Sequence, residues 1–262
     1  MKFYTLLLVL AGFLFFPDLQ AQQLTHVSPC FHDELMYYQN EATPNFRAAV
    51  DKMYYSALNS KNLQTRGNAL YTIKVVFHVV YKNDEENISD TRLNDEISVM
   101  NANFRRKNSD TSNTRAVFKP MAADANIEFK IDRVIRIKTS TLFKPNLLSQ
   151  TNQIPNQVKL SAQGGSDAID PDRYLNIWIC KIEPLELLGI QAGAILGFSY
   201  PPSGLSNWPD GASAPTKSLD GVVVDYRTVG KAGLTYNYPG RETPIALQGR
   251  TMVHEIGHFL GL

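Results

Sequence analysis

The chain is poor in cysteine and has almost no net charge. Only 2 cysteines, Cys30 and Cys180, occur among 262 residues, which excludes a fold held together by several disulfides. Lysine and arginine (26) nearly balance aspartate and glutamate (25), so the formal net charge of +1 offers no basic surface for nucleic acid. A composition with 44% hydrophobic residues is ordinary for a globular protein, and the length allows one substantial domain with a short accessory segment.

The sequence also lacks an apolar run long enough to span a bilayer comfortably. The Leu6–Phe16 run follows Lys2 and precedes a small residue, Ala21, an order typical of a secretory signal peptide. We expect residues 1–21 to be a cleaved signal peptide, with a membrane anchor as the alternative. The protein is therefore predicted to be secreted and extracellular, with no stable membrane anchor.

Histidine is scarce as well, which makes the spacing of two of the five informative. Residues 254–258 have the pattern His-Glu-x-x-His, and residues four apart on a helix share one face, so His254 and His258 can bind one metal ion. Glu255 is expected to be the general base that takes a proton from a zinc-polarised water, which then attacks a peptide carbonyl. The pattern predicts one catalytic Zn²⁺; the alternative is an amphipathic helix whose histidines merely share a face.

Two histidines do not complete a catalytic zinc site, which usually has three protein ligands. Gly261 fits the longer pattern His-Glu-x-x-His-x-x-Gly-x-x-His, in which the glycine adopts a left-handed conformation and a later histidine returns to the metal. That histidine would stand at position 264, past Leu262. We therefore expect a truncated site, and a fragment that is itself inactive. Calcium sites are not readable from the sequence.

Apolar patterning predicts an α/β domain over residues 69–262, preceded by a pro-segment over residues 22–68. A mixed, mostly parallel twisted sheet is expected, with a backing helix and an active-site helix. The backing helix should present Leu93, Ile97, Met100 and Phe104 as its buried stripe, and His78 should be a core or edge histidine and not a metal ligand. The expected strands are 72–81, 127–137, 174–182, 193–200 and 221–226, and the expected helices run from Ser89 to about Arg105 and from Thr243-Pro244 onward.

An ordered set of short segments resembles the pappalysin (cytophagalysin-like) metzincins, zinc metalloproteases similar to pregnancy-associated plasma protein-A. The segments are Thr72–Tyr81 (TIKVVFHVVY), the helix from Leu93-Asn94 to Asn103-Phe104, Gly164-Gly165-Ser166-Asp167, Tyr174–Cys180 (YLNIWIC), Ile195–Phe198 (ILGF), Asp220–Val224 (DGVVV) and Arg250–Leu262 (RTMVHEIGHFLGL). The resemblance covers roughly residues 70–262. It implies a zinc endopeptidase with a cleft between two subdomains, of which this chain supplies the N-terminal one. The C-terminal subdomain and its methionine turn would be absent.

The resemblance also implies two further roles. An extended substrate would pair with an edge strand, for which an ordinary sheet edge is the alternative. The strand residues concerned are Gly193, Ala194, Ile195, Leu196 and Gly197. Some relatives carry a pro-segment cysteine whose thiolate takes the open zinc position, and Cys30 lies in the right region to be that ligand. The alternative is a lone exposed or disulfide-bonded cysteine. Cys180 is expected in the core, so that no disulfide joins the two.

Three functions stay open at this level. The first is a secreted zinc-dependent endopeptidase, made as a zymogen, that hydrolyses protein or peptide substrates. The second is a catalytically inactive metzincin relative that acts as a secreted binding module, against which the intact Glu255 argues. The third is an adhesion or structural domain that binds no metal. Cleavage specificity and oligomeric state are not predicted.

Overall fold

The computed structural model describes residues 30, 32, 40–41, 44–59, 69–146, 154–187, 190–203, 213–231, 235–236, 245–246 and 248–262. The predicted signal peptide and most of the predicted pro-segment lie outside these residues. Within the described ranges, no helix combines the length and the apolar character that a membrane span requires.

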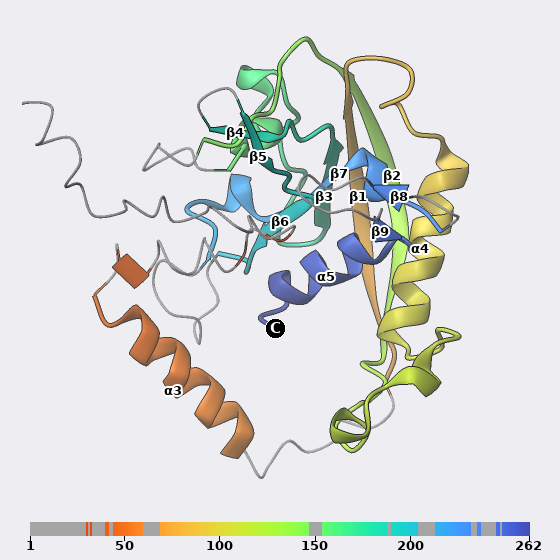
Figure 1. Ribbon diagram of the computed structural model, residues 1–262, viewed down its shortest axis with the longest axis vertical. Helices are drawn as coiled ribbons and strands as arrows, with labels where there is room; N and C mark the ends of the chain where they lie inside the picture. Colours follow the sequence, from red (N-terminus) through yellow and green to blue (C-terminus); the bar gives the residue numbers. More distant parts are fainter. Residues whose placement is uncertain are drawn as a thin grey trace, which may run out of the picture.

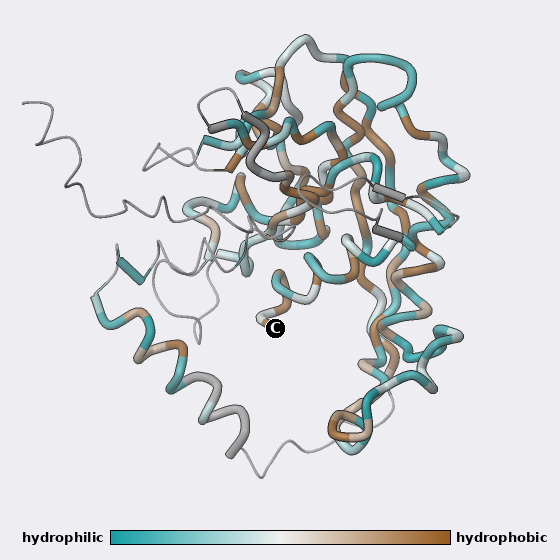
Figure 2. Tube along the Cα trace, in the orientation of Figure 1, coloured by the Kyte–Doolittle hydropathy of each residue, from teal (hydrophilic) through white to brown (hydrophobic). Residues whose placement is uncertain are grey.

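A five-stranded sheet forms the centre of the fold (Figure 1). Strands β2, β1, β3 and β7 run parallel to one another, and β6 pairs antiparallel with β7 at one edge. This confirms the predicted mixed, mostly parallel sheet. Figure 2 shows apolar residues gathered along the central strands, as expected for strands covered on both faces. In sheet order the strands are β2 (Ile127–Lys138), β1 (Tyr71–Tyr81), β3 (Leu175–Cys180), β7 (Gly221–Asp225) and β6 (Gly197–Tyr200).

Helices and short hairpins accompany the sheet. They are α3 (Phe46–Asn59), α4 (Asp90–Phe104), α5 (Arg250–Phe259), the β4–β5 hairpin (Leu185–Leu187 and Ile190–Gly193) and the β8–β9 hairpin (Thr235–Tyr236 and Ile245–Ala246). Helix α3 belongs to the predicted pro-segment and lies outside the layers of the sheet (Figure 1). Phe46 and Val50, two members of its predicted apolar stripe, are buried.

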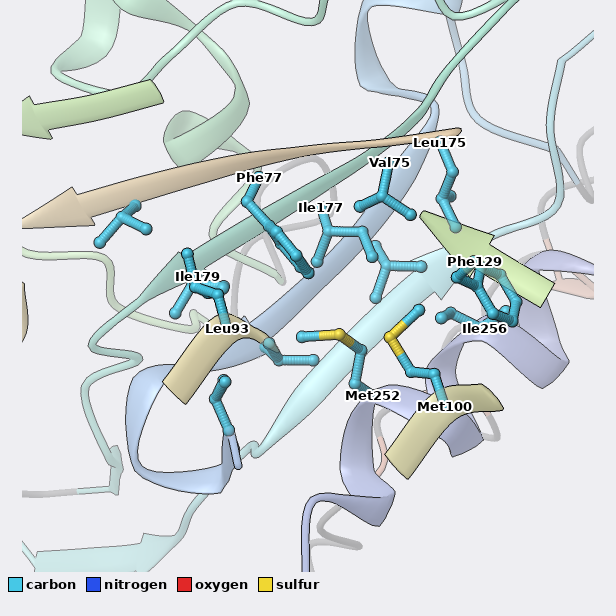
Figure 3. Close-up of a cluster of buried hydrophobic side chains, with 14 of the residues drawn as sticks. Val75, Phe77, Leu93, Met100, Phe129, Leu175, Ile177, Ile179, Met252 and Ile256 are labelled. Atoms are coloured by element: carbon cyan, nitrogen blue, oxygen red, sulfur yellow. The ribbon is translucent and has the colours of Figure 1, made fainter. Parts of the chain in front are cut away.

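Helices α4 and α5 cover one face of the sheet through a shared hydrophobic core. Leu93 and Met100 of α4 meet Met252 and Ile256 of α5 beneath Phe77 of β1 (Figure 3). All five side chains are at most 1% exposed, and burial of each stabilises the fold by about 1.5–3 kcal/mol. Hydrophobic packing therefore fixes α5 against the sheet.

Helix α4 begins where the sequence predicts, because the Ser89 side chain accepts a hydrogen bond from the Arg92 amide and so caps the helix. Its predicted stripe is confirmed, since Leu93 and Met100 are buried and Ile97 and Phe104 pack against the same core. The sequence did not predict that Glu96 is fully buried as well. The reason is tertiary, since Glu96 accepts a hydrogen bond from the loop that follows β7.

A second core covers the opposite face of the sheet and contains Trp178, Cys180 and Phe198. The charged group of Lys159, from the short 3-10 helix η3 (Asn156–Lys159), is fully buried there. Its Nζ donates to the carbonyl oxygens of Leu219 (2.6 Å) and Gly221 (3.2 Å). The Nζ also lies 5.2 to 5.6 Å from the centroids of three aromatic rings, those of Trp178, Phe198 and Tyr200.

His78 is a core histidine, as the sequence predicts. Its Nδ1 lies 2.8 Å from Ser166 Oγ, its Nε2 lies 3.0 Å from Asn176 Oδ1, and its ring stacks on Trp178. Burial lowers the pKa of His78, against a smaller opposing effect of the hydrogen bond to Asn176. A fully buried, hydrogen-bonded imidazole on the inner strand β1 is not placed to bind an external metal ion.

The predicted strand 193–200 is wrong in its middle part. Strand β5 ends at Gly193, β6 begins at Gly197, and the three residues between them are outside any strand. Ala194, Ile195 and Leu196 are each at most 4% exposed. An apolar run is buried in either conformation, so its pattern does not show the break.

The predicted start of the last helix is also wrong. Ile245–Ala246 forms a strand that pairs with β8, and α5 begins only at Arg250. Gln248 (φ 49°) and Gly249 (φ 68°) are both in the left-handed region, which no residue inside a right-handed helix adopts. Thr243-Pro244 lies outside the described residues.

Candidate metal centre

Helix α5 presents two imidazoles to one point. His254 and His258 are one turn apart, and their Nε2 atoms lie 3.0 Å from each other. The backbone oxygen of Leu262 lies 2.8 Å from Nδ1 of His258. When Nδ1–H donates to that carbonyl, the Nε2 lone pair is left facing His254, the tautomer that metal binding requires.

The end of α5 is a Schellman motif centred on Gly261. Gly261 has φ 88°, its amide donates to the His258 carbonyl (3.0 Å), and the Leu262 amide donates to the Gly257 carbonyl (2.9 Å). The left-handed conformation predicted for Gly261 is confirmed. The reversal of the chain brings the Leu262 carbonyl onto His258 and so orients a candidate ligand.

Cys30 lies beside these histidines although it is 228 residues from His258 in the sequence. Its Sγ is 3.2 Å from His258 Nε2, and the donor atoms of Cys30, His254 and His258 all lie within 4.8 Å of one another. Zinc bonds of about 2.0–2.1 Å to nitrogen and 2.3 Å to sulfur place tetrahedral ligand atoms roughly 3.3–3.6 Å apart. The two separations that involve His258, 3.0 Å to His254 and 3.2 Å to Cys30, are slightly shorter than this. Two imidazoles and one thiol are a donor set that fits Zn²⁺. Cys180 is a separate, buried free cysteine.

Contacts of Cys30 and His32 hold the N-terminal segment over the site. Cys30 forms an isolated parallel bridge with Gly197 at the start of the edge strand β6. The His32 amide donates to Cys30 Sγ (3.4 Å), and the His32 ring stacks on His258 with a centroid separation of 3.8 Å. The N-terminal segment therefore covers one candidate ligand and offers a thiol to the same point.

Glu255 is a buried carboxyl beside this donor cluster. It is 1% exposed, and neither side-chain oxygen has a hydrogen-bond partner in the described part of the chain. Burial raises the pKa of Glu255 to about 8, and the nearby Cys30 thiol acts more weakly in the opposite direction. An orphaned buried carboxyl is costly unless a ligand or a water satisfies it, so its position favours a functional role.

Strand β6 makes room for Glu255 and holds its backbone. A Cβ atom at Gly197 would lie 2.7 Å from Glu255 Cγ, too close for any side chain at that position. Ser199, two residues further, donates its hydroxyl to the Glu255 backbone oxygen at 2.7 Å. Of the five predicted edge residues, Gly197 alone has a described contact with the site.

Comparison with known proteins agrees with this chemistry. No protein-family model matches the chain. An extracellular metalloprotease of Arthroderma benhamiae is 26% identical over 217 residues, and one of Trichophyton verrucosum is 25% identical over the same length. Both alignments cover 82% of this chain and 60% of the relative. The chain thus spans about 60% of the length of these curated relatives.

Solved structures are more similar. Mirolysin in complex with a compound is 33% identical with a TM-score of 0.56, and mature mirolysin of Tannerella forsythia in complex with a cleaved peptide is 34% identical with the same TM-score. Each match covers 74% of this chain and 64% of mirolysin. A promirolysin mutant of Tannerella forsythia is 30% identical with a TM-score of 0.65, over 89% of this chain and 68% of promirolysin. The chain belongs to the mirolysin-like family of metalloproteases.

Some parts of this mirolysin-like site were missed at the sequence level. Ser199 and Gly197 act on Glu255 from a strand more than fifty positions away, and no spacing rule connects them. Glu96 was missed as well, because a charged residue on a helix is expected to face solvent, whereas this one is buried. The sequence offered one signal, Gly197 at the start of an apolar strand, because a glycine in a strand often marks the close approach of another group.

Proposed function

We propose that the protein is a secreted zinc-dependent endopeptidase in which His254 and His258 bind the metal and Glu255 is the general base. The observation that carries this proposal is the buried Glu255 carboxyl, whose oxygens have no hydrogen-bond partner within the described ranges and which stands on the helix whose two histidine Nε2 atoms converge. Membership of a metalloprotease family supports it. Bound zinc supplies a Lewis acid that polarises water and the substrate carbonyl.

The chain's own groups account for proton movement. The Glu255 carboxylate would accept a proton from the attacking water and pass it to the departing amine, and burial, which raises its pKa, makes it a stronger base for this step. The Ser199 hydrogen bond and the absence of a side chain at Gly197 keep that carboxyl in one position. The Leu262 carbonyl keeps the His258 ring in its metal-binding orientation.

We further propose that the protein is made as a zymogen and that Cys30 is its latency ligand. The thiol lies where it would occupy a metal coordination position, and its segment pairs with the edge strand β6. The match to promirolysin covers 89% of this chain, against 74% for mature mirolysin, and this larger coverage by a proenzyme supports the proposal. Removal of this segment would free both the metal and the edge.

Edge strand β6 is then the proposed binding edge for an extended peptide. The backbone bridge between Gly197 and Cys30 shows that another segment can pair with this edge, and an extended peptide would pair there in the same way. Mature mirolysin has been solved with a cleaved peptide, which supports a peptide as the ligand class. The ordered sequence motifs favour the pappalysin branch of the metzincins as the finer assignment.

The test is Glu255→Gln in the full-length, processed protein, with zinc content and peptide turnover measured together. We expect one zinc per protein to be retained while turnover falls by about 10²–10⁴-fold, since the variant keeps the shape but cannot accept the proton. Unchanged turnover would disprove the role of Glu255. Zinc binding without any peptidase activity in the unmodified protein would favour the alternative of an inactive binding module.

A further inference from the structure

A buried glutamate links the backing helix to the start of the active-site helix. Glu96 of α4 is fully buried, and its Oε2 accepts a hydrogen bond from the Gly230 amide at 2.6 Å. Its Oε1 has no hydrogen-bond partner in the part of the chain that the structure describes. Burying a carboxyl costs free energy, and here one of its two oxygens has no described partner. Such a residue therefore calls for an explanation other than packing.

The surroundings of Glu96 show what it holds. One turn earlier on α4, Arg92 donates to the backbone oxygens of Val229 (2.6 Å) and Tyr226 (2.9 Å). Arg92 thus binds carbonyls of the loop after β7, while Glu96 binds an amide of the same loop. Burial raises the pKa of Glu96 to about 8, opposed more weakly by the Gly230 hydrogen bond and by Arg92.

The same carboxyl lies against the residue that precedes α5. A Cβ atom at Gly249 would be 2.9 Å from Glu96 Oε2 and 3.1 Å from the Gly230 backbone oxygen. Gly249 is the N-cap of α5, has φ 68°, and contributes no side-chain cap. An oxygen-bearing group at a helix N-terminus is favourable, because the free amides and the helix dipole carry partial positive charge there.

We propose that Glu96 is a positioning residue of the metal centre, which fixes the first turn of α5 and thereby the direction of His254 and His258. A helix transmits a displacement of its first turn along its axis, and His254 follows Gly249 by little more than one turn. The carboxyl touches no ligand and acts only through Gly249 and the loop at Gly230. The inference rests on the proposed function in taking α5 as the metal-binding helix.

Cobalt(II) serves as the probe because its absorption spectrum reports ligand geometry, and the chain is used as it stands. Two variants at one position separate the effects: Glu96→Leu removes the acceptor, whereas Glu96→Gln keeps an acceptor oxygen and the shape. We expect Glu96→Leu to weaken Co²⁺ binding by about 10-fold or more and to alter the spectrum, as loss of groups that orient ligands does elsewhere. Glu96→Gln should restore both to within about twofold.

Glu86→Leu is the matched control. Glu86 is also a buried carboxyl, but it binds within its own turn, accepting from the Lys82 amide and the Asn83 side chain. Its loss should lower the melting temperature and leave Co²⁺ affinity unchanged. If Glu96→Leu behaves in the same way as this control, Glu96 is only structural and the inference is overturned.

A second variant keeps the test decisive if Glu96→Leu does not fold. Gly249→Ala introduces a methyl group against Glu96 Oε2 and should also weaken Co²⁺ binding and alter its spectrum. Unchanged binding by a folded Gly249→Ala protein overturns the inference. If the unmodified chain binds no Co²⁺, both the metal centre and this inference are overturned. If the unmodified chain binds Co²⁺ and neither substitution changes that binding, the inference alone is overturned.

Discussion

Gly197 of the edge strand lies directly against Glu255 of the active-site helix. The space for a Cβ atom at position 197 is filled by the glutamate side chain, with 2.7 Å to its Cγ and 3.1 Å to its Oε1. The glycine at position 197 therefore leaves the space that the proposed catalytic side chain occupies.

The first prediction concerns Gly197→Ala. We expect peptide turnover of the full-length, processed protein to fall by at least about 10-fold while zinc stays bound, because the three atoms nearest to the added methyl group all belong to the Glu255 side chain, which it displaces. Gly257→Ala on α5 is the control, since its Cβ would meet only Leu262 at 4.0 Å. That control should keep its zinc and gain up to about 1 kcal/mol in unfolding free energy. Equal turnover by Gly197→Ala and the unmodified protein would contradict the prediction.

The second prediction concerns the two thiols. If Cys30 binds the metal, zinc should protect it from alkylation by iodoacetamide, and a chelator should restore its reactivity. Cys180 is an internal control, because it is fully buried and burial raises the pKa of its thiol well above the usual value. It should react only after unfolding. Peptide mass spectrometry resolves the two sites, and equal labelling of Cys30 with and without zinc would refute its role as a ligand.

The third prediction is a pH dependence from Lys159. Burial lowers the pKa of Lys159 to about 7, against a weaker opposing effect of Asp220. Between pH 7 and the unfolded value near 10.5 the unfolded chain binds more protons, so the unfolding free energy rises with pH through this window. The cost of the buried charge is fully present below pH 7. The slope contributed by one group is at most about 1.4 kcal/mol per pH unit.

Lys159→Met should remove this contribution while keeping most of the side-chain volume. Urea unfolding at a series of pH values between 7 and 10 measures the difference between the two proteins. We expect the stability of the unmodified protein to rise relative to that of Lys159→Met across the series. Parallel curves would mean that Lys159 does not titrate in this range.

The fourth prediction concerns metal removal. Zinc that binds only the folded chain should raise the unfolding free energy by about 2.7 kcal/mol at a free concentration of 100 times its Kd. His254→Ala should abolish this gain because it removes one of the converging nitrogens. Cys30→Ala should leave a smaller gain than the unmodified chain shows, because it removes the thiol of the same donor set. A zinc-independent melting temperature would argue against the site.

The local parts of the site were predictable from the sequence, and the long-range parts were not. The spacing of His254 and His258 and the left-handed Gly261 follow from helix geometry, which acts over a few residues. The approach of Cys30 to His258 depends on packing across 228 positions, and the family resemblance alone suggested it.

Errors in the predicted elements have the same origin. The helical stripe of α4 correctly placed Leu93 and Met100, but periodicity cannot anticipate a buried Glu96 whose partner amide belongs to another loop. Hydrophobicity predicted burial of residues 194–196 and not the break in the strand, because tertiary packing decided the backbone conformation there.

Helix α5 owes its place to Met252 and Ile256 in the core, and the metal has no part in that packing. Small domains whose folding free energy comes from zinc unfold when the ion is withdrawn. Here the two imidazoles stay on a packed helix, so a chelator should leave a folded protein that recovers when zinc is returned. Metal binding is thereby a reversible step that follows folding. Where zinc is scarce, the protein would stay folded without metal and inactive.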